Sequence, residues 1–351
     1  MIVIPEGLYR GSKIRAGEPG FALSIVAGMT MPLCLCLSLK EIATHSMNKV
    51  GYIYDDVFLR HEPPAWHPDT GERLRAINAG LKTAGLWEKL VHIKPRPASL
   101  EELGFVHTAA HIEAIRSLGA GEIDPDTYAS AGSFAAARTA AGAVMEAVDQ
   151  CRLNGLRRVF CAVRPPGHHA EAALSMGFCL FNNVAVGARY AQRAGYPRVF
   201  IVDFDAHHGN GTQHIFEEDD SVFYFSTHQH PYYPDTGKDM ERGRGKGEGF
   251  TYNFPIRAGS GNKDYLMVYQ DILPPLVSRF APDLILVSAG YDIHADDPHA
   301  NIRVTHEGIR GIVRSILASA AVPAVFVLEG GYELSSLCDS VKITIEEMLR
   351  E

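Results

Sequence analysis

The stretch RVFIVDFDAHHGNGTQ, Arg198 to Gln213, joins an apolar run directly to a cluster of polar side chains. Val199–Val202 has the β-branched and aromatic composition of a buried strand. The residues that follow it include acidic and metal-binding types: Asp203, Asp205, His207 and His208. A strand that only needed to end would use one or two turn residues. We therefore expect this strand to end in a functional site.

The composition is typical of a globular α/β protein. The chain has 351 residues, of which 46% are hydrophobic and 21% are charged. Its 33 basic and 41 acidic residues give a net charge of -8, which argues against a general nucleic-acid binder. The 6 cysteines form no CxxC pair, so we expect reduced thiols in a cytoplasmic enzyme.

Residues 1–46 differ from the rest of the chain. The segment Phe21–Leu39 carries no charge and resembles a signal or anchor segment, although Pro32 interrupts it and no small-residue cleavage site follows. Met47 is an alternative start, because the sequence pattern becomes coherent directly after it. Residues 1–46 are then a non-native or dispensable extension, and otherwise a targeting segment for export or anchoring. We expect residues 47–351 to form a single domain.

From residue 50 onward, short apolar runs alternate with longer Ala-rich stretches. Ser133–Arg152 and Asn182–Gly195 have helical spacing, and the second ends in a glycine suited to a helix C-terminus. Strands without a polar face predict a parallel sheet that is covered by helices on both sides. The expected strands are Val159–Val163, Val199–Val202, Val222–Phe225, Leu284–Ser288 and Val325–Leu328.

Four of these strands end in side chains that carry chemistry. Ligands bind beyond the carboxyl ends of the strands in open parallel sheets. The strand ends therefore predict one active site at one edge of the sheet. The side chains delivered there are His168, His169, Asp203, Asp205, His207, Asp292, Glu329 and Tyr332.

Three of these residues form a candidate metal site. Asp205 and His207 are two positions apart, so they point the same way on an extended backbone. With Asp292 they offer two carboxylates and one imidazole, the pattern of a catalytic zinc with an open position. Fe(II) or Co(II) are ions that this ligand set also accepts.

The remaining residues have roles that such a site needs. His168 and His169 are candidates for a general base and an acid. Asp203 and Asn210 are available to bind their far ring nitrogens and fix their tautomers. Tyr332 follows a glycine pair that we expect to be flexible, so its hydroxyl is predicted to swing toward a substrate carbonyl oxygen in an amide hydrolysis.

Five segments resemble the signature blocks of the zinc-dependent histone deacetylase family, which includes the acetylpolyamine amidohydrolases. The segments are RPPGHHA, GFCLFNNVAV, VDFDAHHGNGTQHIF, SAGYD and LEGGY. Asn210, where other members have an aspartate, resembles the class II branch, as in bacterial or archaeal members. The resemblance implies an arginase–deacetylase α/β fold around an eight-stranded parallel sheet, and zinc bound by Asp205, His207 and Asp292.

The resemblance also implies roles for the paired histidines. Similar proteins pair the first histidine with the buried aspartate, here His168 with Asp203, and the second with the residue at Asn210. His169 is then the general base and His168 the electrostatic or acid partner. Tyr332 polarises the carbonyl.

Further residues carry over from the family to a substrate tunnel. Gly177, Phe178 and Tyr233 fall on its walls, which implies a narrow apolar tunnel for an acyl-aminoalkyl chain. Asp126 matches an acid at the tunnel rim that accepts substrate backbone amides. His299 stands where relatives have leucine or methionine, or an acid in some polyamine-specific members. Both substrate classes therefore stay open.

A structural potassium ion is a further implication of the resemblance. Many relatives bind it through the loop from Asp203 to His207. The matching hydroxyl residues here are Ser226 and Thr227.

We therefore expect a deacetylase that acts on acyl-lysine side chains or related N-acyl amines, with acetylpolyamines as the alternative. An arginase-like ureohydrolase is less consistent, because it needs a carboxylate where this chain has Gly209. An inactive acyl-lysine binding module is the other alternative. The expected partner is an acetylated lysine peptide or small acyl amine, without nucleic acid or a membrane, and a homo-oligomer is left open.

Overall fold

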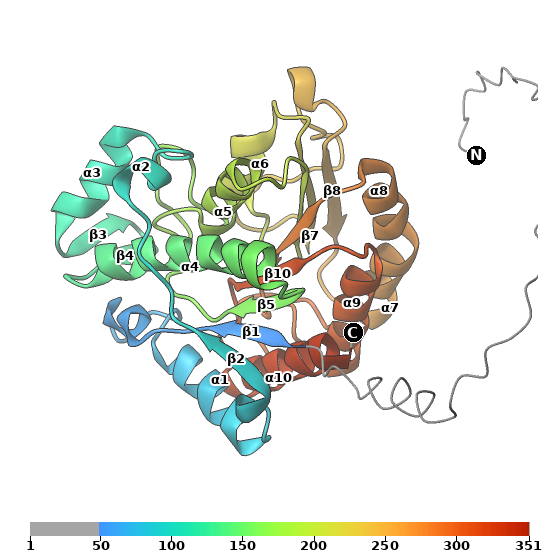
Figure 1. The fold of residues 1–351 in the computed structure, drawn as a ribbon, viewed down its shortest axis with the longest axis horizontal. Helices are drawn as coiled ribbons and strands as arrows, with labels where there is room; N and C mark the ends of the chain where they lie inside the picture. The colour runs from blue at the N-terminus through green and yellow to red at the C-terminus, as the bar shows by residue number, and fades with distance from the viewer. Residues whose placement is uncertain (1–48, 351) are drawn as a thin grey trace, which may run out of the picture. The chain divides into compact units, whose positions relative to one another are not determined.

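The structure is a computed structural model that describes residues 49–350; the segment Phe21–Leu39, with the rest of the N-terminal extension, lies outside them. An eight-stranded sheet has the order β2-β1-β5-β10-β9-β6-β7-β8 (Figure 1). Every neighbouring pair is parallel, so the predicted sheet is confirmed. The strands are β1 (Val50–Ile53), β2 (Leu90–Ile93), β5 (Arg158–Cys161), β6 (Val199–Asp203), β7 (Val222–Gln229), β8 (Thr251–Ile256), β9 (Leu284–Ala289) and β10 (Ala324–Leu328).

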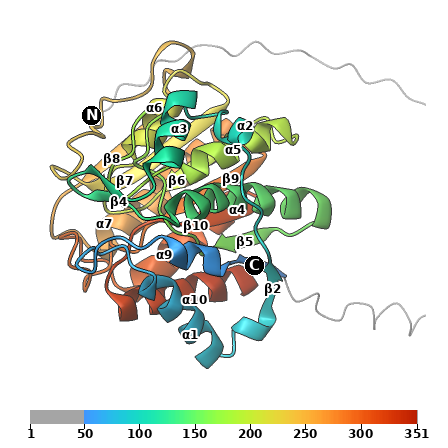
Figure 2. The same cartoon turned by 90° about the vertical axis from the view of Figure 1, so that its left-hand side faces the viewer.

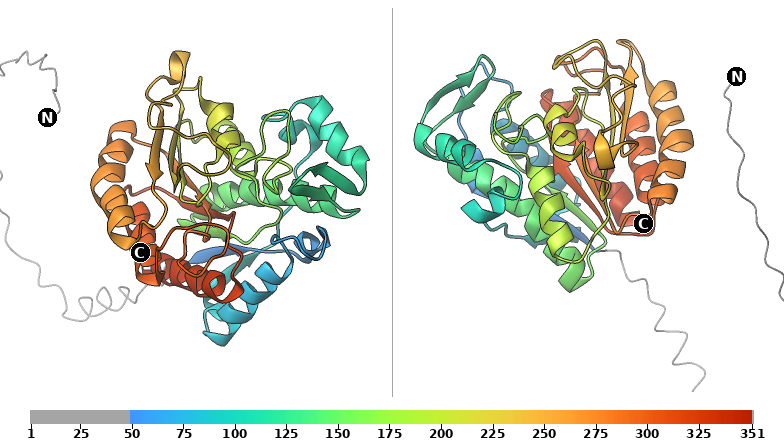
Figure 3. Two further views of the ribbon diagram at one scale, coloured as in Figure 1. Left: turned by 180° about the vertical axis from the view of Figure 1, so that it is seen from behind. Right: turned by 90° about the horizontal axis from the view of Figure 1, so that it is seen from above.

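Helices cover both faces of the sheet, as the sequence predicted. Helices α4 and α5 pack together on one face, whereas α1, α9 and α10 pack together on the other (Figures 1 and 2). The view from above in Figure 3 shows the sheet between these layers. The helices are α1 (Glu72–Thr83), α2 (Leu100–Leu103), α3 (Ala109–Leu118), α4 (Ser133–Asn154), α5 (Asn183–Arg193), α6 (Asn210–Phe216), α7 (Asn262–Met267), α8 (Leu273–Phe280), α9 (His306–Ala318) and α10 (Leu334–Arg350).

The small residues of α4 and α5 let the two helices approach closely. Helix α4 is followed by Gly155, whose φ of 69° is the left-handed conformation that commonly ends a helix. A Cβ added at Gly187 in α5 would lie 2.3 Å from Val144 Cγ1 in α4. The Ala-rich composition that predicted these helices therefore also reflects how tightly they pack.

The register of the sheet brings the ends of the central strands to one level. Asp203 at the end of β6 is the partner of Ser226 in β7 and of Ser288 in β9. Leu328 at the end of β10 is the partner of Ala289 in β9. Because β5 adjoins β10 in the same sheet, the loops that follow β5, β6, β9 and β10 meet at one edge.

An antiparallel hairpin lies outside the main sheet. It consists of β3 (Gly121–Asp124) and β4 (Thr127–Ala129), and Asp126 lies in its turn. Among residues 49–350, none of the helices combines the length and the apolar character needed to cross a membrane.

Candidate active site

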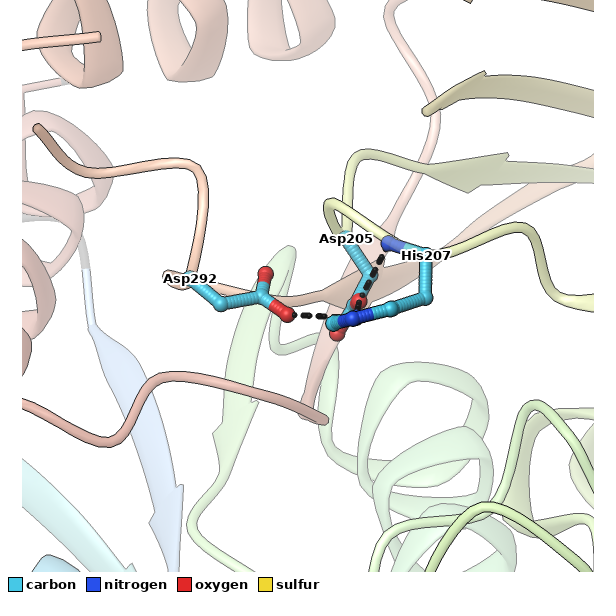
Figure 4. Close-up of side chains that lie close together, drawn as sticks. All are labelled: Asp205, His207 and Asp292. Atoms are coloured by element: carbon cyan, nitrogen blue, oxygen red, sulfur yellow. Dashed lines mark hydrogen bonds and ion pairs between the residues drawn. The ribbon is translucent and has the colours of Figure 1, made fainter. Parts of the chain in front are cut away.

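Asp205, His207 and Asp292 converge where the loops after β6 and β9 meet (Figure 4). One potential ligand atom from each lies within 4.8 Å of the others. His207 Nδ1 lies 2.9 Å from Asp292 Oδ2 and 3.1 Å from Asp205 Oδ1. The second oxygen of each carboxylate accepts a backbone N–H, from Gly330 at 2.8 Å and from Ala206 at 2.9 Å. Backbone contacts therefore orient both carboxylates toward the imidazole.

This group fits a divalent metal ion. Asp205 and Asp292 are buried side by side. Burial, followed by the charge of Asp205, raises the pKa of Asp292 to about 7. Two such carboxylates ionise together at little cost only when a cation neutralises them. Carboxylate oxygens and an imidazole nitrogen are ligands that zinc accepts.

A second metal ion of the arginase kind has no carboxylate to bridge it. Gly209 stands at the position where that site needs an acid. A Cβ at this glycine would lie 2.3 Å from Asp203 Oδ2 and 2.6 Å from the Tyr224 hydroxyl. The position therefore has no room for a side chain.

The two adjacent histidines have different partners. His168 Nδ1 lies 3.1 Å from Asp203 Oδ2, and His169 Nδ1 lies 2.8 Å from Asn210 Oδ1. Burial opposes the charged form of His168, but Asp205 and Asp203 outweigh it and raise its pKa to about 10. Burial, then the proximity of His168, lowers the pKa of His169 well below its usual value. At neutral pH, His168 is therefore cationic and His169 is neutral, as a general base must be.

Glu329 holds the turn that carries both histidines. Its Oε2 accepts the backbone N–H of Gly167 at 2.7 Å and that of His168 at 3.3 Å. Its Oε1 accepts the Ser288 hydroxyl at 3.1 Å. The sequence marked Glu329 as a strand-end residue but indicated no role for it.

Hydrogen bonds hold the backbone of the glycine pair before Tyr332, which the sequence led us to expect as flexible. Arg73 Nε donates to the Gly331 carbonyl at 2.6 Å, and the Tyr332 N–H donates to Asp297 Oδ2 at 2.6 Å. A Cβ at Gly330 would lie 2.6 Å from Asp205 Oδ2 and from Asp292 Oδ2. Glycine is present here because the backbone passes so close to the carboxylates.

Arg73 belongs to a buried ion-pair network that the sequence did not reveal. Asp69 Oδ1 accepts from Arg73 Nη1 and from Arg164 Nε, both at 2.8 Å. Burial would raise the pKa of Asp69, but Arg164 and Arg73 hold it below its usual value. The i,i+4 spacing of Asp69 and Arg73 is the local sequence signal for this ion pair.

A partly open cavity of about 120 Å³ is lined by His168, His169, His207 and Tyr332. The ring centroids of Phe178 and Tyr332 are 5.8 Å apart, and those of Tyr233 and His169 are 5.2 Å apart. Both pairs are arranged edge-on. Gly177 has a φ of 56°, and a Cβ there would lie 2.3 Å from the His169 ring. The structure thus brings the three predicted wall residues together around a narrow opening.

The two predicted rim residues also line this cavity. Asp126 Oδ1 accepts the backbone N–H of Gly177 at 3.2 Å, so this acid also holds the tunnel wall. Burial, then Asp124, raises the pKa of Asp126 to about 6. The His299 ring lies 4.6 Å from the Tyr332 ring, and burial lowers its pKa. A neutral His299 is therefore the main form at neutral pH.

The hydroxyl residues predicted for potassium lie beside the metal-site loop. Ser226 adjoins Asp203 across the β6–β7 ladder. Its hydroxyl is within 2.9 Å of His228 Nδ1, and the Thr227 hydroxyl is within 2.9 Å of the Tyr269 hydroxyl. The potassium site stays a prediction.

Comparisons with known proteins agree on one family. The histone deacetylase domain matches residues 67–348. A probable deacetylase of Archaeoglobus fulgidus is 39% identical over 292 residues, 81% of this chain and 81% of that protein. The polyamine deacetylase HDAC10 of Homo sapiens is 38% identical and covers 86% of this chain, but the match spans only 47% of the human protein. The crystal structure of the HDA15 HD domain has a TM-score of 0.83 at 40% identity and covers 86% of this chain and 91% of that one.

Proposed function

The chain belongs to the histone deacetylase family and is a deacetylase by that membership; we propose that it uses zinc to remove acetyl or other short acyl groups from lysine side chains or related N-acyl amines. One observation carries this proposal. The candidate ligands Asp205, His207 and Asp292 adjoin a cationic and a neutral histidine. One narrow cavity is lined by His168, His169, His207 and Tyr332.

Asp205, His207 and Asp292 would hold the zinc ion. When bound, zinc supplies a Lewis acid that polarises the substrate carbonyl and acidifies water. Fe(II) or Co(II) would serve in its place. A structural potassium ion near Asp203, Ser226 and Thr227 belongs to the same proposal.

His169 acts as the general base. Its Nδ1–H donates to Asn210 Oδ1, which leaves the lone pair of Nε2 free to accept a proton from the attacking water. His168, positively charged beside Asp203, stabilises the negative charge that develops during attack. The proton held by His169 then serves the leaving amine.

Tyr332 supplies the second stabilising contact. Burial raises the pKa of its hydroxyl well above the usual value, so the proton needed for donation is retained. Arg73 and Asp297 fix the peptide group that joins Gly331 to Tyr332, and Asp297 also accepts the backbone N–H of Glu333. In this mechanism the hydroxyl donates to the carbonyl oxygen as its charge grows.

The tunnel favours a linear substrate. A narrow cavity between Phe178 and Tyr233 accepts an extended alkylamine and excludes a bulky amide. Asp126 at the rim would accept a peptide N–H, and His299 offers no charge at neutral pH to attract a second ammonium group. Acetyl-lysine peptides and other monoacylated amines are therefore the proposed substrates, with acetylpolyamines as the alternative.

Residues 47–351 form one catalytic domain in this proposal, working in the cytoplasm with its thiols reduced. The test is a fluorogenic acetyl-lysine assay with and without chelator, followed by addition of zinc. Activity that disappears with chelation and returns with zinc supports the proposal. Absence of activity on acetyl-lysine and acetylspermidine substrates by the zinc-loaded protein would favour the inactive binding module.

A further inference from the structure

The side-chain amide of Asn210 can lie in two orientations that differ chemically, whereas the carboxylate of an aspartate has two equivalent oxygens. Both oxygens of an aspartate accept hydrogen bonds, whereas an asparagine amide has one accepting end and one donating end. Only the orientation with Oδ1 toward His169 Nδ1 selects the Nδ1–H tautomer and leaves Nε2 basic. The opposite orientation would present an N–H to Nδ1 and put the proton on Nε2. Some other group must therefore fix the amide.

Glu171 contacts the donating end of that amide. Asn210 Nδ2 donates to Glu171 Oε1 at 2.6 Å. A carboxylate only accepts, so it binds the NH2 end of the amide and rejects the carbonyl end. The other contacts of Asn210 Nδ2, with the His169 carbonyl and Met176 Sδ, are both 3.4 Å long. The short contact with Glu171 is thus the one able to set the orientation.

We propose that Glu171 is a positioning residue that fixes the Asn210 amide and, through it, the tautomer of His169. This inference rests on the proposed role of His169 as general base. The chain of contacts is His169 Nδ1–H to Asn210 Oδ1 at 2.8 Å, then Asn210 Nδ2–H to Glu171 Oε1 at 2.6 Å. An aspartate at position 210 would place its negative charge directly beside His169. In this chain the charge is on Glu171, one hydrogen bond further from His169.

His214 completes this chain at the surface. Its Nδ1 donates to the same Glu171 Oε1 at 2.8 Å. That hydrogen bond is the main cause that raises the pKa of His214, and the nearby acids Glu217 and Glu241 raise it further. The ring lines a surface cavity of about 520 Å³ that Arg242 and Arg244 also line. The imidazole holds Glu171 in place from its outer side.

The proposal predicts that Glu171→Gln changes kcat in opposite directions in the native protein and in an Asn210→Asp background. In the native protein, Glu171→Gln should lower kcat by roughly tenfold with little change in KM, because a glutamine can present either end to Asn210. In an Asn210→Asp background, the native Glu171 places two carboxylates in contact. There Glu171→Gln should raise kcat at pH 8, because the glutamine amide donates to the introduced carboxylate, whereas the native glutamate repels it.

A matched control is Glu218→Gln, at an exposed position close in sequence to His214 and without a hydrogen bond to Asn210 or Glu171. It should leave kcat within about twofold, as a surface substitution away from the chain of contacts does. A second measurement is independent of activity. In metal-free protein with 15N-labelled histidine, the His169 shifts should report Nδ1–H in the native protein and a mixture in Glu171→Gln.

Two results would overturn the inference. One is an equal, same-direction effect of Glu171→Gln in both backgrounds, as a merely structural role would give. The other is an unchanged His169 tautomer in Glu171→Gln. The activity of the native protein distinguishes this failure from a failure of the proposed function. If the native protein shows no chelator-sensitive deacetylation, the proposed function is wrong. The 15N shifts still test the contacts among His169, Asn210 and Glu171.

Discussion

The rings of His168 and His169 lie with their centroids 4.0 Å apart, yet the two imidazoles have opposite protonation states. Asp205 and Asp203 raise the pKa of His168 against the effect of burial, whereas burial and the proximity of His168 lower the pKa of His169. The residue behind each ring also differs. Asp203 provides a charge behind His168, whereas Asn210 provides only an amide behind His169. One histidine therefore supplies charge and its neighbour supplies a basic nitrogen.

The charge on His168 predicts the alkaline side of the pH profile. Asp203 is one of the carboxylates that raise the pKa of His168, so the cation is present below that raised pKa and is lost as the pH rises through it. Asp203→Asn removes one of the charges that raise this pKa, so the alkaline limb of kcat/KM should move to lower pH. An unshifted limb, with the variant folded, would contradict the assigned charge.

Tyr332→Phe tests the hydroxyl donor. Loss of this donor should lower kcat roughly 100-fold or more, as removal of an oxyanion contact does. The ring contacts with Phe178 and His299 remain possible for phenylalanine, so folding and metal content should be retained. Unchanged turnover would remove the hydroxyl from the mechanism.

Gly330→Ala tests why glycine follows β10. The added Cβ would lie 2.6 Å from Asp205 Oδ2 and from Asp292 Oδ2, so the metal ligands must shift. Metal affinity should fall at least tenfold, measured by competition with a chelating dye. Gly261→Ala, whose Cβ would have the Arg303 carbonyl oxygen as its nearest neighbour at 3.1 Å, is the control and should bind metal normally.

His299→Glu should change substrate preference. A carboxylate at the rim attracts the distal ammonium of an acetylpolyamine, which should shift the kcat/KM ratio toward acetylspermidine roughly tenfold at low salt. The native protein should prefer acetyl-lysine peptides. If the ratio does not move, the turn that carries Asp126 becomes the next candidate for selectivity.

The parallel sheet and the position of the site were predictable because their signals are local. Each strand is one short apolar run, and its functional side chains follow within a few positions, as Asp203 and Asp205 follow the apolar run of β6. The edge of a parallel sheet then brings these ends together without further information. The same reasoning located Asp292 and Tyr332.

The supporting contacts were less predictable because they join distant segments. Arg73 donates to the Glu329 carbonyl from 256 positions away, and nothing near Arg73 in the sequence indicates this partner. The close approach of Gly330 to the carboxylates was unpredictable for a different reason. A glycine can mean either a flexible turn or a close backbone approach, and only the neighbouring carboxylates distinguish the two.

Metal content measured together with activity tests whether catalysis depends on a bound metal ion. Purified protein and the Asp292→Ala variant would be stripped with chelator, reloaded with zinc and assayed on an acetyl-lysine peptide. The native protein should bind one catalytic zinc per chain and recover its activity on reloading, while the folded variant should bind zinc weakly and stay inactive. Full activity in the metal-free native protein, or in metal-free Asp292→Ala, would show that catalysis does not need the metal ion.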